Sequence, residues 1–137
     1  MTHDERVSGI QRLRDLSEAL DETDAQLYLF FQLCPVVMAV TDRTYFRRVS
    51  KYMCDVLGYT ETDLLAKPWA SLLHPTDVSR AGALKRSLIR GTPAFTFQTK
   101  VRTKDGRYCL LDWTASPYTP AGLAYSVATI RGHLDEP

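Results

Sequence analysis

The chain has 137 residues, which suggests one domain, and its 45% apolar and 24% charged residues are ordinary for a globular protein. The net charge of +1, without a long Lys/Arg run, argues against a nucleic-acid partner or an anionic lipid surface. The charged first residues lack the apolar stretch of a signal peptide. Residues 27–40 are the most apolar segment, but they fall short of the roughly 20 residues of a membrane helix. We therefore expect a cytoplasmic protein, and we expect no membrane contact by this chain.

The cysteines and histidines give no sign of a disulfide framework or a metal site. The three cysteines are far apart and form no CxxC pair, so we expect reduced thiols that act as small buried hydrophobic groups. The three histidines are not clustered with cysteines or carboxylates, and we predict no metal site.

The N-terminal residues 1–23 are predicted to form an amphipathic helix. Leucines recur at alternating spacings of three and four, which is typical of a heptad seam, although Thr23 interrupts it. One interpretation is a short coiled coil that mediates dimerisation, and the other is a helix packed on its own domain. A break at residues 21–24 is a further possibility, since Thr23 and Gln26 have capping-box spacing. The leucines expected at a dimer seam are Leu13, Leu16, Leu20 and Leu27.

Two strands and two short helices are predicted next. Pro35 ends the helical stretch, and the segments 36–40 and 44–49 are typical of strands joined by a tight turn. Ser50 is the predicted N-cap of a helix over 51–57, which ends at a glycine C-cap. A second capping pattern begins at Thr60 and predicts a short helix over residues 61–65.

The rest of the chain changes from helical to strand periodicity. Residues 68–73 are expected to form a helical turn, and a helix is predicted over 77–90. From residue 95 the apolar residues alternate with polar ones, and an Asp-Gly turn within 104–107 indicates a hairpin. Strands are predicted over 109–115 and 123–130 as well. The expected fold class is α+β, with a five-stranded antiparallel sheet and short helices on one face.

This order of elements, together with five short motifs, resembles the PAS family. The motifs are Cys34-Pro35 before the first strand, Leu57-Gly58-Tyr59-Thr60, Leu73-His74-Pro75-Thr76-Asp77, Lys104-Asp105-Gly106, and the strand from Trp113 to Pro117. The resemblance implies a PAS domain over residues 24–131, followed by a C-terminal tail over 132–137. The chain departs from the family pattern at Ser50, where Asn is usual, and in the tight turn before Thr44, which lacks the usual Gly. It also departs at 132–134, where many members have Asp-Ile-Thr.

The cofactors of the family's specialised branches are not expected. The flavin-binding branch has a reactive cysteine in the segment that corresponds to residues 66–73, which contains none. The haem-binding branch has an axial histidine on the long helix, and residues 77–90 contain none. His74 stands at the entrance of that helix, where we expect it to act as a loop or helix-start residue. No flavin or haem is therefore predicted, which leaves an unidentified small molecule as the possible ligand.

The resemblance implies that a curved sheet could enclose an apolar pocket under its helices. Thr99, Ser126 and Tyr125 could supply polar contacts to a ligand, whereas the alternative is that large apolar side chains simply fill the core. Trp69 and Trp113 are favoured within this set because each indole N–H needs a partner. The predicted pocket residues are Met38, Met53, Trp69, Leu73, Leu84, Phe95, Phe97, Leu111, Trp113 and Tyr125.

An enzyme of the cone-shaped isomerase or dehydratase type is a less favoured alternative. His74 and Asp77 could form an acid–base pair, but Asp77 is better explained by its interaction with the helix dipole. Asp42 is expected to shape a turn and Asp112 to be solvated. We therefore predict no catalytic residues.

The leading functional hypothesis is a bacterial sensory domain that binds a small apolar or amphipathic ligand, forms a homodimer, or does both. Its effector is expected to be a histidine kinase of a two-component system, a cyclic-di-GMP enzyme or a transcription regulator. In this hypothesis a change at the pocket alters the pairing of the N-terminal helix. The alternative is a ligand-free homodimerisation module that uses that helix and the outer face of the sheet.

Overall fold

The computed structural model describes the backbone of residues 3–92 and 94–134. It describes the side chains of these residues except at 3–7, 17, 20, 21 and 94–96. The chain divides into two units, Met1–Gln32 and Leu33–Pro137. Among the residues that the structure describes, no helix is both long and apolar enough to cross a membrane.

The described part of the first unit is formed by α1 (His3–Leu33), an uninterrupted helix whose last residue, Leu33, belongs to the second unit. The Thr23 hydroxyl donates to the carbonyl of Ala19, at 2.8 Å, and therefore bonds within the helix and does not cap a new one. The considered break at residues 21–24 is wrong, because helical backbone continues through it. The two units meet between Gln32 and Leu33, and the predicted domain boundary after residue 23 stays a prediction.

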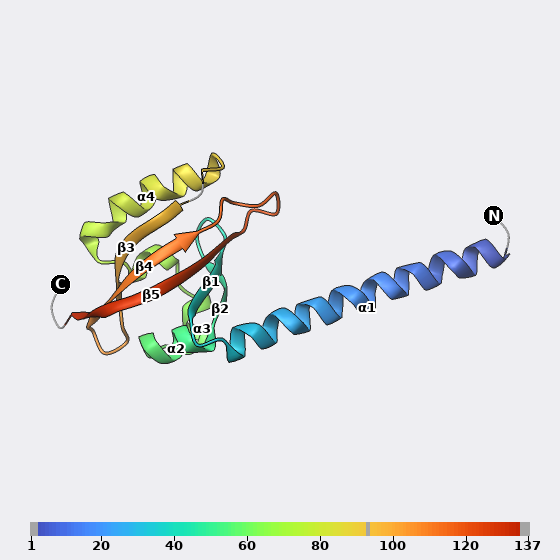
Figure 1. The fold of residues 1–137 in the computed structure, drawn as a ribbon, viewed down its shortest axis with the longest axis horizontal. Coiled ribbons are helices and arrows are strands. Elements are labelled where there is room, and N and C mark those ends of the chain that lie inside the picture. Colours follow the sequence, from blue (N-terminus) through green and yellow to red (C-terminus); the bar gives the residue numbers. More distant parts are fainter. Residues whose placement is uncertain (1–2, 93, 135–137) are drawn as a thin grey trace. The chain divides into compact units, whose positions relative to one another are not determined.

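The second unit is a five-stranded antiparallel sheet with short helices, as the sequence predicts (Figure 1). The strand order is β2-β1-β5-β4-β3, so the last three strands form a meander and the first pair joins it through β5. Helix α4 contacts β3, and α3 contacts β2. The strands are β1 (Val37–Thr41), β2 (Phe46–Val49), β3 (Ala94–Arg102), β4 (Tyr108–Ala115) and β5 (Ala124–Leu134). The helices are α2 (Lys51–Leu57), α3 (Glu61–Leu65), the 3-10 turn η1 (Trp69–Leu72) and α4 (Pro75–Ile89).

Local capping explains where the short helices begin and end. The Ser50 hydroxyl accepts from the backbone N–H of Met53 at 3.1 Å, which starts α2 as predicted. Gly58 ends that helix with φ 84°, a left-handed conformation that disfavours residues with a Cβ. Thr60 and Asp63 form a complete capping box at the start of α3.

Strand β5 is longer than the sequence predicts. Residues 132–134, expected as the start of a tail, pair with β4 through Leu110↔Gly132, Cys109↔His133 and Tyr108↔Leu134. Strand β4 is long enough to provide hydrogen-bonding partners for residues 132–134. The sequence of β5 taken alone does not reveal those partners.

The core lies between the inner face of the sheet and the helices α2 and α3. Its side chains are among the most deeply buried in the described part of the chain, and the buried Cys109 behaves as the expected small hydrophobic group. All three cysteines are free thiols. The largest apolar side chains with at most 1% of their surface exposed are Met53, Leu57, Leu64, Leu72, Leu111, Val37 and Val49.

Candidate functional site

An apolar cavity of about 90 Å³ lies inside the second unit. Helix α4 contributes Ala81, Leu84, Lys85 and Leu88, η1 contributes two residues, and the inner faces of the strands supply most of the remainder. The cavity is therefore formed where α4 covers the sheet. Apolar atoms make up most of its wall, which suits a ligand of low polarity.

Small side chains account for this empty space. Ala81 on α4, Ala115 on β4, and Ala124 and Ser126 on β5 all line the cavity. Each places only a short side chain where a larger group would otherwise fill the interior, so the space between helix and sheet is not closed.

Six of the predicted pocket residues line this cavity. They come from five different elements and from the junction that precedes α4, so only the fold brings them together. The six are Met53, Trp69, Leu73, Leu84, Phe97 and Trp113. Leu111 is fully buried and belongs to the core, but it is not a lining residue. The side chain of Phe95 lies outside the described residues.

Met38 and Tyr125 were predicted as lining residues, and the structure places them on the opposite face of the sheet. Met38 pairs with Val127 and Tyr125 pairs with Val40 in the β1–β5 ladder. Because side chains alternate along a strand, the inward positions of Ala124 and Ser126 direct Tyr125 outward. Tyr125 has 44% of its surface exposed, which removes it from the candidate site together with its hydroxyl.

The polar groups at the cavity bond mainly to one another and to the backbone. The indole N–H of Trp113 donates to the hydroxyl of Thr99 at 2.9 Å, in a buried pair. The Ser126 hydroxyl donates to the carbonyl of Ala39 at 3.2 Å. Thr99 and Ser126 were both predicted as polar lining groups, and both do line the cavity. The Thr99 oxygen is already an acceptor, so its own O–H can donate to a bound molecule.

Asp42 organises the turn at one edge of this site. Its carboxylate accepts from the backbone N–H groups of Thr44 at 2.8 Å and Tyr45 at 2.6 Å. The bond from Tyr45 is the main reason that the pKa of Asp42 lies below its ordinary value. The carbonyl of Asp42 also accepts from the Trp69 indole and the Tyr118 hydroxyl, each at 3.4 Å. The predicted turn-shaping role is thus accompanied by a tie to a cavity-lining tryptophan.

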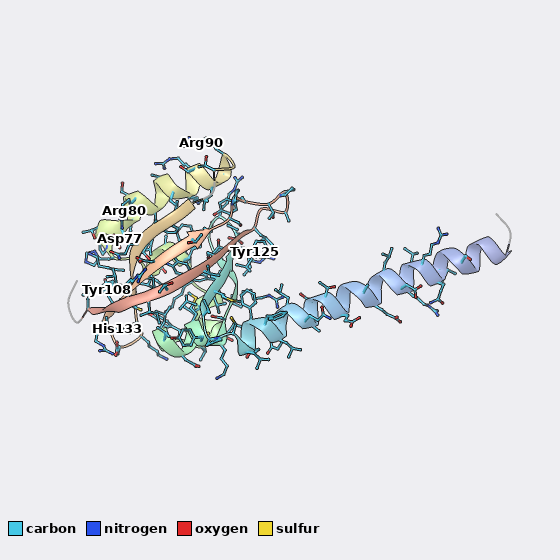
Figure 2. All side chains as sticks on the ribbon, in the orientation of Figure 1. Asp77, Arg80, Arg90, Tyr108, Tyr125 and His133 are labelled. Atoms are coloured by element: carbon cyan, nitrogen blue, oxygen red, sulfur yellow. The ribbon has the colours of Figure 1, made fainter. Side chains whose placement is uncertain are left out.

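The candidate acid–base pair holds the first turn of α4 against β3. His74 is the N-cap of α4, and its Nδ1 accepts from the backbone N–H of Thr76 at 3.1 Å. Asp77 is 4% exposed and accepts from the backbone N–H of Lys100 at 2.7 Å and from Arg80 at 2.9 Å. Figure 2 places Asp77 and Arg80 at the same end of α4. Sequence reasoning predicted the helix-start role of both residues but missed the bond to β3, because Lys100 is distant in sequence.

Other ionisable groups of the described chain do not assemble into a metal or acid–base centre. No group of three or more His, Cys, Asp or Glu side chains that could hold a metal ion occurs among the residues described. Asp112 accepts hydrogen bonds from Arg131 and Gln98, and the Arg131 bond is the main cause of its lowered pKa. Its strand partner Thr129 is exposed, which is consistent with the predicted position away from the core.

Sequence reasoning missed the contribution of α4 beyond Leu84. Ala81, Lys85 and Leu88 lie three or four residues apart, so they share one helical face with Leu84. That spacing was the available signal. Only large apolar residues were considered as lining candidates, so Ala81 and Lys85 on the same face were missed.

Comparisons with known proteins agree with this architecture. The model of the family described as "PAS fold" matches residues 46–130, which is more than half of the chain. A domain of a sensory box sensor histidine kinase/response regulator from Geobacter sulfurreducens is 22% identical with a TM-score of 0.68, covering 80% of this chain and 95% of that one. The PAS domain of an HTR-like protein from Haloarcula marismortui is 17% identical with a TM-score of 0.66, covering 85% and 98%.

A ligand-bound structure is also similar. The PAS domain of the Cronobacter turicensis RpfR quorum-sensing receptor, in complex with C12:0, is 14% identical with a TM-score of 0.62. The match covers 72% of this chain and 96% of that one. None of the curated proteins compared with the chain matches it. The family match, which covers β2, the helices that follow it, β3, β4 and most of β5, decides the assignment: the chain belongs to the PAS fold family.

Proposed function

We propose that this chain is a cytoplasmic sensory domain whose signal is a small apolar or amphipathic molecule held in the cavity under α4. The observation that carries the proposal is the cavity itself, with its largely apolar wall and the hydroxyls of Thr99 and Ser126. A non-catalytic role is supported by the engagement of His74 and Asp77 in the start of α4. The similar domain from Cronobacter turicensis, which was solved in complex with C12:0, supports a ligand of low polarity.

In this proposal, occupation of the cavity changes the position of α4 and of the sheet strands that it covers. A ligand shifts such an equilibrium only as far as it binds one arrangement more tightly than the other. The output would be a histidine kinase, a cyclic-di-GMP enzyme or a transcription regulator. The sensor histidine kinase from which the Geobacter domain comes supports the first of these.

A cavity-filling substitution tests the proposal. Native mass spectrometry of protein expressed in a heterologous host, together with an absorption spectrum, should show a retained small molecule without a haem or flavin band. We expect Ala81→Leu to lose that molecule, because Ala81 lines the cavity and is buried. The matched control is Ala83→Leu, which makes the same change on the exposed face of α4 and should keep the molecule.

Three outcomes would contradict the proposal. Retention of the molecule by Ala81→Leu, in a protein that circular dichroism shows to be folded, would place the ligand elsewhere. A wild-type protein that is an apo dimer and that binds no small molecule would favour the second candidate function. An absorption band of haem or flavin would contradict the prediction that neither cofactor is bound.

The second candidate function is ligand-free homodimerisation through α1. The described leucines of the predicted seam differ in exposure, with Leu13 at 69%, Leu16 at 61% and Leu27 half-buried. The side chain of Leu20 lies outside the described residues. Ile10 is also 51% exposed. A helix of this length with large apolar groups in solvent is stabilised when a second copy covers them, which supports the proposal.

A charge substitution on α1 tests this dimer. We expect the double substitution Leu13→Asp and Leu16→Asp to convert a dimer into a monomer in multi-angle light scattering, because it places charges in the seam. The control Gln11→Asp and Arg14→Asp adds acidic residues at exposed positions of the same helix and should leave the mass unchanged. A dimer that survives the leucine substitutions would show that the seam is not the contact.

A further inference from the structure

Among the described residues that line the cavity, Lys85 is the charged one. It lies on the inner face of α4, one turn after Ala81 and next to Leu84, and it is half-buried. The other polar lining groups are hydroxyls, the indole N–H of Trp69 and that of Trp113. A cationic group at an otherwise apolar cavity is unusual, because burying charge without a partner costs free energy.

Lys85 lacks an acidic partner within its own region of the chain. The residues one helical turn away on either side are Ala81, Gly82, Leu88 and Ile89, none of which can pair with it. The sequence from Val78 to Lys104 contains no Asp or Glu at all. Asp77, the acidic residue of α4, is bonded to Arg80 and to the backbone of Lys100.

The surrounding charges make this region attractive to an anion. Arg86 follows Lys85 on α4 and Arg90 is the C-cap of that helix, which Figure 2 shows at the end opposite Asp77. Nearby cations raise the local potential and favour a negative group. Lysine buries its methylene stem while it keeps its ammonium in contact with water. With its stem along the apolar wall, the half-buried Lys85 would present its ammonium at the rim of the cavity.

The size of the cavity limits what can occupy it. An apolar protein cavity of roughly 150 Å³ accommodates a benzene ring, and this one measures about 90 Å³. A short aliphatic chain fits that space better than an aromatic ring or a long acyl chain. A single lysine, without the several convergent donors that a phosphate group needs, is suited to a monoanion.

We propose that the ligand of this cavity is a short-chain aliphatic monocarboxylate, with its hydrocarbon part among the apolar lining residues and its carboxylate paired with Lys85 at the rim. This inference rests on the proposed ligand-binding function and assigns its chemical class. Lys85 then acts as the residue that selects an acid over a neutral molecule of the same shape, because only the acid compensates its charge.

The test uses matched probes on the full chain. Isothermal titration calorimetry is carried out with pentanoate, pentanamide and dodecanoate on the wild type, Lys85→Gln, Lys85→Arg and Lys51→Gln. Wild-type protein should bind pentanoate about tenfold more tightly than pentanamide, as expected for a charge-assisted hydrogen bond. Lys85→Gln should remove that preference and Lys85→Arg should retain it. The control Lys51→Gln neutralises an exposed lysine on α2, outside the cavity, and should behave as wild type.

Each contrary result has a distinct meaning. Equal affinities for pentanoate and pentanamide, unchanged in Lys85→Gln, would overturn the carboxylate assignment and leave the ligand-binding function standing. Tighter binding of dodecanoate than of pentanoate would overturn the assignment of a short chain. If none of the three probes binds, the inference fails, and the retained-ligand experiment with Ala81→Leu decides separately whether the proposed function fails as well.

Discussion

The two parts of the domain interior rest on the same sheet, but one is filled and the other is hollow. Under α2 and α3, Leu57 and Leu64 have at most 1% of their surface exposed and belong to a continuous core. Under α4, Leu84 and Lys85 are half-buried and line a cavity. The comparison shows that close packing and empty space lie in separate parts of this fold. The α2–α3 side is packed as protein interiors usually are, and the α4 side contains a cavity.

The largest expected effect comes from truncating one leucine in each part. Leu64→Ala should lower the free energy of unfolding by about 2–5 kcal/mol, because it opens a cavity in a filled core. Leu84→Ala should cost clearly less, because its side chain already borders empty space and solvent. Urea denaturation followed by circular dichroism measures both. Equal losses would show that the two parts are packed alike.

A smaller effect is expected at Ser50, which ties the filled part together. Its fully buried hydroxyl accepts from Met38 and Met53, each at 3.1 Å, and donates to the carbonyl of Val36 at 2.8 Å. Ser50→Ala should lower the free energy of unfolding by about 1–3 kcal/mol, because the buried backbone groups lose their partner.

The matched control for Ser50 is Ser71→Ala. The Ser71 hydroxyl donates to a single carbonyl, that of Pro68, at 2.6 Å, at an exposed position. Its removal should change stability by less than about 0.5 kcal/mol, as is usual for surface substitutions. Comparable losses from the two substitutions would contradict the assignment of Ser50 as a link between β1 and α2.

The smallest effect on stability is expected at low pH, in the turn at Asp42 beside the cavity. The pKa of Asp42 is lowered in the folded chain, chiefly by the N–H of Tyr45, so the ionised carboxylate stabilises the fold. That contribution is present above the ordinary Asp pKa of about 3.9 and is lost as the pH falls through the lower folded value. Asp42→Asn keeps a side-chain oxygen for the turn but lacks this titration. The gap in melting temperature between wild type and Asp42→Asn should therefore shrink below about pH 4, and parallel curves would contradict the assignment.

Strand β5 shows why the candidate site could be predicted only in part. Its outer face carries the large residues Tyr125 and Val127, whereas its inner face carries the small residues Ala124, Ser126 and Ala128. Choosing large apolar residues as pocket residues therefore selects the wrong face of this strand. On β3 and β4 the same choice succeeds for Phe97 and Trp113, because there the large side chains do point inward.

The sequence by itself determined the elements whose cause is local. Helix α2 begins and ends, and helix α3 begins, where the predicted caps place them, because a cap bonds to backbone groups within three or four residues. The hairpin between β3 and β4 and the order of the family motifs are likewise properties of short segments. Only the tertiary structure decided which face of β5 is inward, that β5 continues to Leu134, and that Asp77 bonds to β3. The cavity beside Lys85 also depends on it, because the space arises where small residues distant in sequence meet under α4.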